Sequence, residues 1–126
     1  MEKQLDITGG VDRRRHQRFR VKDGALAFLG TVPGTIVDIS ESGMTVHYVV
    51  LEKEPERSLR LDIFFSGNDF YLPDIPSELV SDMSSLPDTP FSTLRVKRLG
   101  IKFGELTGKQ KDKIKYFILH NTIALA

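Results

Sequence analysis

The chain has 126 residues, of which 40% are hydrophobic and none is cysteine, so we expect one domain with one apolar core, without disulfide bonds, thiolate metal sites or cysteine nucleophiles. The formal net charge is only +1, but the charge is unevenly distributed. Six of the ten residues from Arg13 to Lys22 are basic, and the rest of the chain has 12 basic against 17 acidic residues, which predicts a local site for an anion rather than a broad nucleic-acid-binding surface.

The first residues of the chain have no periodic hydrophobic pattern and include Gly9 and Gly10, so we expect a flexible leader over residues 1–12. This start is polar and acidic, unlike a secretory signal. No apolar run approaches the ~20 residues that span a bilayer. We therefore expect a cytoplasmic protein without membrane insertion, in which residues 13–126 form a single domain.

Short apolar segments after the basic arm predict antiparallel strands. Residues 25–29 and 35–37 form two apolar runs separated by glycine and proline, which is typical of two strands joined by a turn. Residues 44–50 alternate in the manner of a half-buried strand, and residues 59–65 show the clearest alternation in the chain. The segment 66–69, Ser-Gly-Asn-Asp, is typical of a hairpin turn.

Residues 70–92 contain four of the six prolines: Pro73, Pro76, Pro87 and Pro90. Proline lacks the N–H that a central strand donates, so this pattern excludes an uninterrupted central strand and favours an edge strand around residues 79–83 between loops. A last strand is expected from Leu94 to Phe103, with Gly100 marking a bulge.

The hydrophobic period changes near the end of the chain. Thr107 and Gln110 fit a capping box, which predicts a helix over residues 107–124, with Ile114, Phe117, Ile118 and Leu125 on one face. Several short strands followed by one helix predict an all-β domain. We expect a small antiparallel barrel over residues 19–104, braced by the C-terminal helix.

Two short motifs flank the first predicted strands. The first is Arg14-Arg15-His16-Gln17-Arg18, and the second is Asp38-Ile39-Ser40-Glu41-Ser42-Gly43. Each has a structural explanation by itself, because a basic terminal run is commonly a solvated tail and Asp-x-Ser-x-x-Gly commonly forms a turn. Together, in this order on a β pattern, they indicate a binding site.

The two motifs resemble the RxxxR and [D/N]xSxxG elements of the PilZ domain family. Residues 100–103, Gly-Ile-Lys-Phe, are similar to the usual end of the family's last strand, so the resemblance covers roughly residues 12–120. It implies a six-stranded antiparallel β-barrel that binds the bacterial second messenger cyclic di-GMP. It also implies that Arg13, directly before the first motif, helps to capture a stacked pair of ligand molecules.

The side chains of both motifs suit this ligand. An arginine fork donates two hydrogen bonds to O6 and N7 of guanine and also stacks on purines, so we assign this role to Arg14 and Arg18. The Asp38 carboxylate accepts from guanine N1 and N2, and Ser40 offers a hydroxyl to phosphate or base. Gly43 permits a positive φ and a close backbone approach to the ligand.

We therefore expect a receptor without catalytic activity or cofactor. No pair of carboxylates is spaced for acid–base chemistry, and the three histidines are scattered, so no metal site is predicted. The expected mechanism is ordering of a mobile arm, residues 13–18, when cyclic di-GMP binds, so that a protein partner reads the new surface.

Two other functions are left open by the same residues. One is an RNA- or single-strand-binding barrel, in which the arm grips phosphates and aromatic rings stack on bases. The other is a degenerate PilZ-like module that acts only through protein contacts. DNA is not expected as a partner.

Overall fold

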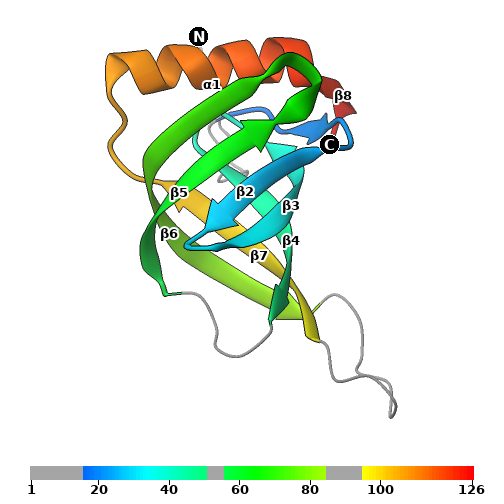
Figure 1. Ribbon diagram of the computed structural model, residues 1–126, viewed down its shortest axis with the longest axis vertical. Helices are drawn as coiled ribbons and strands as arrows, with labels where there is room; N and C mark the ends of the chain where they lie inside the picture. The colour runs from blue at the N-terminus through cyan, green and yellow to red at the C-terminus, as the bar shows by residue number, and fades with distance from the viewer. Residues whose placement is uncertain (1–15, 51–55, 85–94) are drawn as a thin grey trace, which may run out of the picture.

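The computed structural model describes residues 16–50, 56–84 and 95–126, and in these ranges the chain forms a barrel with one helix across an open end (Figure 1). The predicted leader 1–12 and the site residues Arg13 and Arg14 lie outside the described residues. The elements are β1 (Phe19–Val21), β2 (Ala25–Leu29), β3 (Val32–Ile39), β4 (Gly43–Val50), β5 (Ser58–Phe65), the 3-10 helix η2 (Ser66–Asn68), β6 (Phe70–Ser84), β7 (Arg95–Phe103), α1 (Gly108–Asn121) and β8 (Thr122–Leu125).

Six of the strands close into a barrel. They follow the order β2-β5-β6-β7-β4-β3, and β3 pairs back to β2, with every pairing antiparallel. The predicted all-β class and the six-stranded antiparallel barrel are therefore confirmed. Strand β1 pairs with the last residues of β3, and β8 pairs with β1, so these two short strands extend the sheet beyond the closed barrel.

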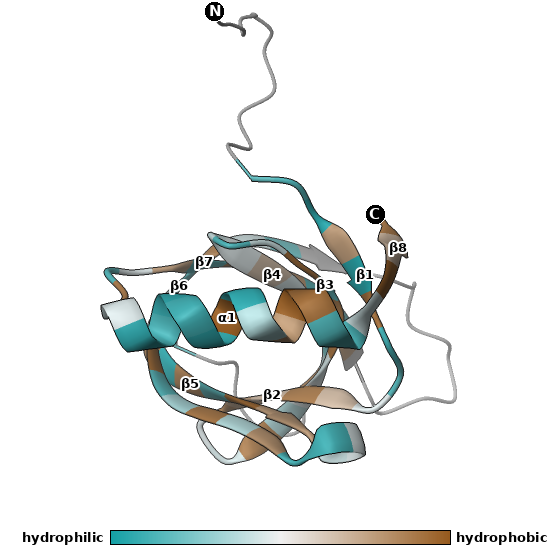
Figure 2. Ribbon diagram, turned by 90° about the horizontal axis from the view of Figure 1, so that it is seen from above, coloured by the Kyte–Doolittle hydropathy of each residue, from teal (hydrophilic) through white to brown (hydrophobic). Residues whose placement is uncertain are grey.

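Alternating apolar side chains fill the interior. In β4 and β5 the alternate residues Val46, Tyr48, Leu61 and Ile63 are buried, as the period of two requires when one face of a strand packs on a core. Figure 2 shows α1 lying across the barrel opening. The helix places two fully buried residues, Ile114 and Phe117, on the end of this core.

The capping box at the start of α1 is confirmed, but the predicted end of the helix is wrong. Gln110 N donates to Thr107 Oγ1 at 3.1 Å, and Thr107 N donates to Gln110 Oε1 at 3.0 Å. The helix stops at Asn121, whose carbonyl accepts from Lys22 N at 2.9 Å. Residues 122–125 then pair with β1, so Leu125 is 63% exposed instead of lying on the buried helical face.

The loop expected before residue 79 is wrong, because β6 runs without a break from Phe70 to Ser84. The edge strand expected around residues 79–83 is borne out in part, since in the register this half of β6 pairs with β7 and no longer with β5. Two residues of β6 are Pro73 and Pro76. Its register shows how they are tolerated: residues 70–78 pair with β5, whereas pairing with β7 begins only at Ser77. Both prolines thus lie in the half of β6 that pairs in register with β5 but not yet with β7, which is where a strand tolerates proline best.

The bulge expected at Gly100 of β7 lies instead in the neighbouring strand, β6. Leu79 pairs with Ile101 and Ser81 pairs with Gly100, so Val80 is the extra residue in β6. A Cβ atom on Gly100 would collide with the Ser81 hydroxyl. A side chain at position 100 would therefore require the Ser81 hydroxyl to rotate away from β7.

Candidate ligand-binding site

Asp38 lies at the surface because a β-bulge interrupts β3. Ile36 pairs with Val46 but Asp38 pairs with Thr45, so Val37 is an extra residue in β3. In a regular strand Asp38 would follow Ile36 onto the interior face, since residues i and i+2 point the same way. The bulge reverses the alternation. It leaves Ile39 fully buried in the core and lets Asp38 line a surface concavity.

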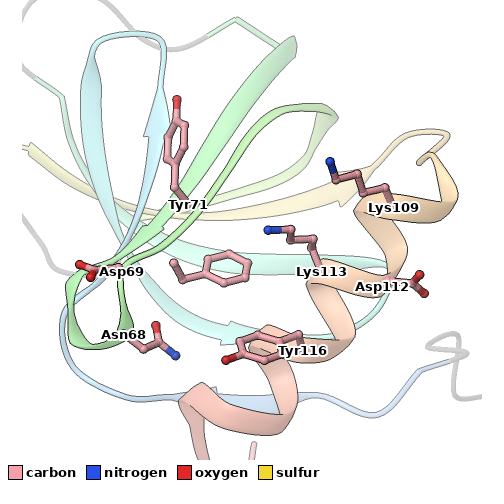
Figure 3. A pocket seen from close by; sticks show the side chains of 8 residues that line it. Asn68, Asp69, Tyr71, Lys109, Asp112, Lys113 and Tyr116 are labelled. Atoms are coloured by element: carbon pink, nitrogen blue, oxygen red, sulfur yellow. The ribbon is translucent and has the colours of Figure 1, made fainter.

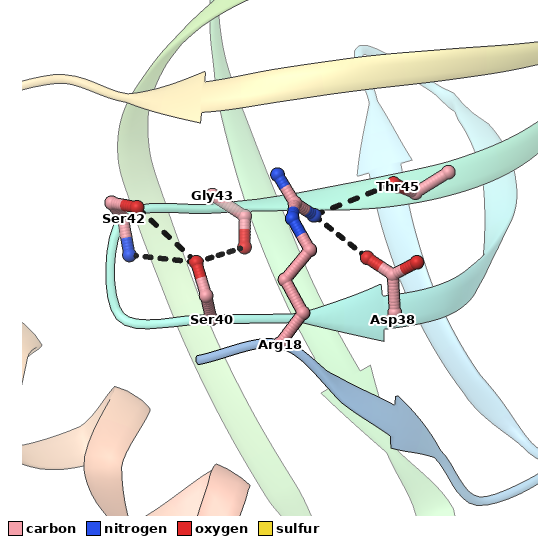
Figure 4. A network of polar contacts seen from close by, with 6 residues as sticks. All are labelled: Arg18, Asp38, Ser40, Ser42, Gly43 and Thr45. Carbon is pink, nitrogen blue, oxygen red and sulfur yellow. Dashed lines mark hydrogen bonds and ion pairs between the residues drawn. The ribbon is translucent and has the colours of Figure 1, made fainter. Parts of the chain in front are cut away.

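Arg18 and Asp38 are joined by an ion pair, as Figure 4 shows. Arg18 Nη1 donates to Asp38 Oδ1 at 2.7 Å and contacts Thr45 Oγ1 at 3.4 Å. Register places the two partners together, because β1 begins directly after Arg18 and pairs Arg20 with Asp38. The side chains are only 20% and 10% exposed, so this pair is shielded from water more than a typical surface pair.

Arg18 still carries an unused donor. Its Nε atom is buried and has no hydrogen-bond partner among the described residues. Buried polar atoms in folded proteins nearly always have a hydrogen-bond partner, so this donor is an exception. This donor is enclosed by protein, so in its present position it counts as a cost of burying the Arg18 side chain.

The concavity beside this ion pair has a volume of about 240 Å³. Its lining consists of Arg18, Arg20, Val37, Asp38, Arg98 and Ala126. Three guanidinium groups and one carboxylate give it a positive balance, which favours an anion. Sequence reasoning missed Arg98 as a site residue. Its position could have been inferred from the alternation with the buried residues Leu99 and Ile101.

Ser40 shapes the turn between β3 and β4. Its side chain is 1% exposed. Ser40 Oγ accepts from Ser42 N at 3.1 Å and lies 3.2 Å from Ser42 Oγ, while Ser40 N donates to the Gly43 carbonyl at 2.8 Å. The predicted contact of Ser40 with a ligand stays a prediction, because its hydroxyl is engaged within the turn (Figure 4).

Gly43 has a structural role different from the expected one. Its φ is not positive, since the positive-φ glycines among the described residues are Gly24 and Gly30. A Cβ atom on Gly43 would collide with the Ile101 carbonyl of β7. The glycine is therefore needed for the close approach of β7 to the turn.

A second concavity, of about 470 Å³, lies on the other side of the turn. Its lining consists of His16, Glu41, Ser42, Phe103, Gly104, Glu105, Leu106, Lys111 and Lys115. His16 borders this concavity and Arg18 borders the first one, so the start of the described chain runs along both. The Asp38–Gly43 turn and the end of the basic arm are thus brought together, as the sequence predicted.

The described part of the chain offers no group of three or more His, Cys, Asp or Glu side chains that could bind a metal ion. Within the same residues, α1 is too short and too polar to cross a bilayer.

Comparisons with known proteins agree with this architecture. The family model described as "PilZ domain" matches residues 12–120. Among curated proteins, none matches the sequence significantly.

Solved structures with the same fold include the PilZ domain of YcgR from Escherichia coli with c-di-GMP, with a TM-score of 0.65 and 12% identity over 86% of this chain and 90% of that one. The YcgR complex with c-di-GMP gives a TM-score of 0.63 at 14% identity, again over 86% of this chain. The K. pneumonia MrkH–c-di-GMP complex gives 0.64 at 16% identity over the same share. The match spans 46% of the YcgR chain and 52% of the MrkH chain.

The close approach at Gly43 predicts a large effect of one added methyl group. Gly43→Ala is expected to lower the free energy of unfolding by about 1–3 kcal/mol, because β7 must move away from the turn. Urea denaturation measures the change. Gly108→Ala is the matched control, because a Cβ there meets nothing within 4 Å. Equal stability of the two variants would contradict the assigned role.

The shielded ion pair predicts measurable coupling between Arg18 and Asp38. A double-mutant cycle with Arg18→Ala and Asp38→Ala should give a coupling energy of about 1–2 kcal/mol in urea denaturation. The exposed pair Arg60–Asp74, with a 3.5 Å separation and side chains 63% and 70% exposed, should give less than about 0.5 kcal/mol. A coupling energy near zero for the first pair would contradict the geometry.

Proposed function

The chain belongs to the PilZ domain family, and from this premise we propose that it is a non-catalytic receptor for cyclic di-GMP. The observation that carries the proposal is the concavity lined by Arg18, Arg20, Arg98 and Asp38, in which guanidinium groups outnumber the carboxylate. The two phosphodiester charges of cyclic di-GMP balance the excess of guanidinium groups in this concavity, and its guanines offer acceptors to them.

Arg18 and Asp38 divide the recognition of one guanine between them. The free donors of the Arg18 guanidinium reach O6 and N7 or a phosphate oxygen, while Asp38 Oδ1 holds the guanidinium in position. The second Asp38 oxygen accepts from guanine N1 and N2. The ion pair therefore orients an arginine fork before the ligand arrives, which reduces the entropy cost of binding.

Arg20 and Arg98 extend this site toward the ligand phosphates. Both line the concavity with Arg18, and a guanidinium donates well to phosphate oxygens. Arg13 and Arg14 of the N-terminal arm complete the ligand shell, and Arg13 supports a stacked pair of cyclic di-GMP molecules. Two or three such contacts, less the cost of ordering the arm, give a dissociation constant on the order of 1 μM.

Ordering of the arm transmits the signal to a protein partner. Arg18 is already held by Asp38, and its carbonyl accepts from Ala126 N at 3.1 Å. The ordering step therefore concerns residues 13–17, whose positive charges repel one another until ligand phosphates neutralise them. A single-strand-binding barrel gains no support from the Arg18 concavity, because its lining contains no aromatic ring for base stacking.

Calorimetric titration tests the receptor function. Cyclic di-GMP should bind on the order of 1 μM, and cyclic di-AMP should bind at least about tenfold more weakly because adenine presents N6–H₂ where guanine presents O6. The stoichiometry separates one bound molecule from a stacked pair. Absence of heat with cyclic di-GMP would support a module that acts through protein contacts alone, and equal binding of both dinucleotides would support a general nucleic-acid binder.

Substitutions in the concavity should weaken binding while preserving the fold. Arg18→Lys keeps the charge but loses the fork, and Arg98→Ala removes a phosphate contact. Each is expected to raise the dissociation constant by about fivefold or more, corresponding to at least about 1 kcal/mol. Arg60→Ala, on the exposed outer face of β5, is the matched control and should bind like the parent protein. Unchanged affinity of both site variants would overturn the assigned site.

The arm-ordering step is tested by NMR. Side-chain and backbone resonances of residues 13–17 should sharpen and shift on titration with cyclic di-GMP, while those of Arg18 should shift without a large change in order. Amide resonances of this segment that show the same order and positions with and without ligand would contradict the mechanism.

A further inference from the structure

A groove remote from the Arg18 concavity lies between α1 and the turn that joins β5 to β6. It has a volume of about 500 Å³. Its lining consists of Asn68, Asp69, Phe70, Tyr71, Lys109, Asp112, Lys113 and Tyr116. None of these residues lines either concavity beside the Asp38–Gly43 turn, so the groove is a separate feature of the surface.

Positive charge faces into this groove. Figure 3 shows Lys109 and Lys113, one helical turn apart on α1, extending toward the side of the groove formed by Tyr71. Asp69 and Asp112 also line the groove, which therefore has two acidic and two basic residues, but their carboxylates point outward from its centre. Among the described residues, neither ammonium group has a carboxylate within 4 Å. The α1 segment has four lysines against one aspartate, which strengthens the positive potential along this helix.

Aromatic rings form the remaining walls. Phe70 stacks on Tyr116 with ring centroids 6.3 Å apart and packs edge-on against Phe117 at 5.1 Å. Tyr71 and Tyr116 are 53% and 50% exposed. The Tyr71 hydroxyl donates to Asp62 Oδ2 at 3.2 Å, a contact that raises the Tyr71 pKa and keeps this phenol neutral. Fixed tyrosine rings beside exposed apolar surface are typical of protein-binding hot spots.

We propose that this groove docks an acidic segment of a partner protein that carries one aromatic or aliphatic anchor residue. The acidic side chains pair with Lys109 and Lys113, and the anchor packs on the half-exposed rings of Tyr71 and Tyr116. A free small molecule fits less well. Small-molecule sites bury most of their ligand, whereas both tyrosine walls here are half-exposed. A segment of a protein is shielded from water on its outer side by the rest of that protein.

Peptide binding to the full chain tests this docking site by NMR. The probe is a blocked acidic peptide with one central phenylalanine, and its control has glycine in place of the phenylalanine. The first peptide should shift resonances of α1 and of the β5–β6 turn, with a dissociation constant on the order of 0.1–1 mM. The glycine peptide should bind at least about threefold more weakly because it lacks the anchor.

Two double variants that change the net charge equally distinguish docking in the groove from non-specific electrostatic attraction to the helix. The variant with Lys109→Glu and Lys113→Glu should raise the dissociation constant of the phenylalanine peptide by about tenfold, because two attractive charge pairs become repulsive. The control variant has Lys111→Glu and Lys115→Glu, two α1 residues that border the concavity beside the Asp38–Gly43 turn. It should change the dissociation constant by less than about twofold at physiological salt.

Three results would overturn the proposal: no shifts at the groove with either peptide, equal weakening by both double variants, or tighter binding of phenyl phosphate than of the phenylalanine peptide. The last result would identify a small-molecule site. Each is independent of the cyclic di-GMP titration, because the groove and the Arg18 concavity share no lining residue.

Discussion

One extra residue in β3, Val37, determines the chemistry of this surface. The bulge turns Asp38 away from the core and toward Arg18, while Ile39 returns to the interior. The resulting 2.7 Å ion pair attaches the end of the basic arm to the barrel wall. It also leaves the Arg18 Nε donor buried without a partner. A local irregularity of the sheet thus couples the fold to ligand recognition.

Two surfaces of different chemistry lie on the barrel. One lies at β1, β3 and β7, where three arginines and Asp38 line a small concavity. The other lies between α1 and the β5–β6 turn, where lysines and tyrosines face a groove. Helix α1 borders this groove and also the concavity beside the Asp38–Gly43 turn. Its position across the barrel end depends on Phe117, which contacts Phe65 and Phe70 in the core.

Predictions from the sequence failed where pairing, rather than residue type, decides the outcome. The prolines of residues 70–92 indicated loops, but β6 runs unbroken through Pro73 and Pro76, which precede the start of its register with β7 at Ser77. Gly43 was expected to allow a positive φ, yet its φ is not positive and the nearest obstacle to a side chain is the Ile101 carbonyl of a strand more than fifty residues away. Arg98 was missed for the same reason, since only the pairing of β7 with β4 brings it near the site.

The sequence by itself determined the strand periods, the capping box of α1 and the two motifs, because each depends on residues close together in the chain. These patterns predicted an all-β antiparallel barrel. The resemblance of the two motifs to PilZ elements added the six strands and the expectation that Arg18 and Asp38 lie at one site, but not their ion pair. Only the tertiary structure decided the bulge at Val37, the burial of Ser40, the end of α1 at Asn121 and the pairing of β8 with β1. These features arise from hydrogen bonds between distant strands, and short-range patterns carry no information about which distant backbone approaches.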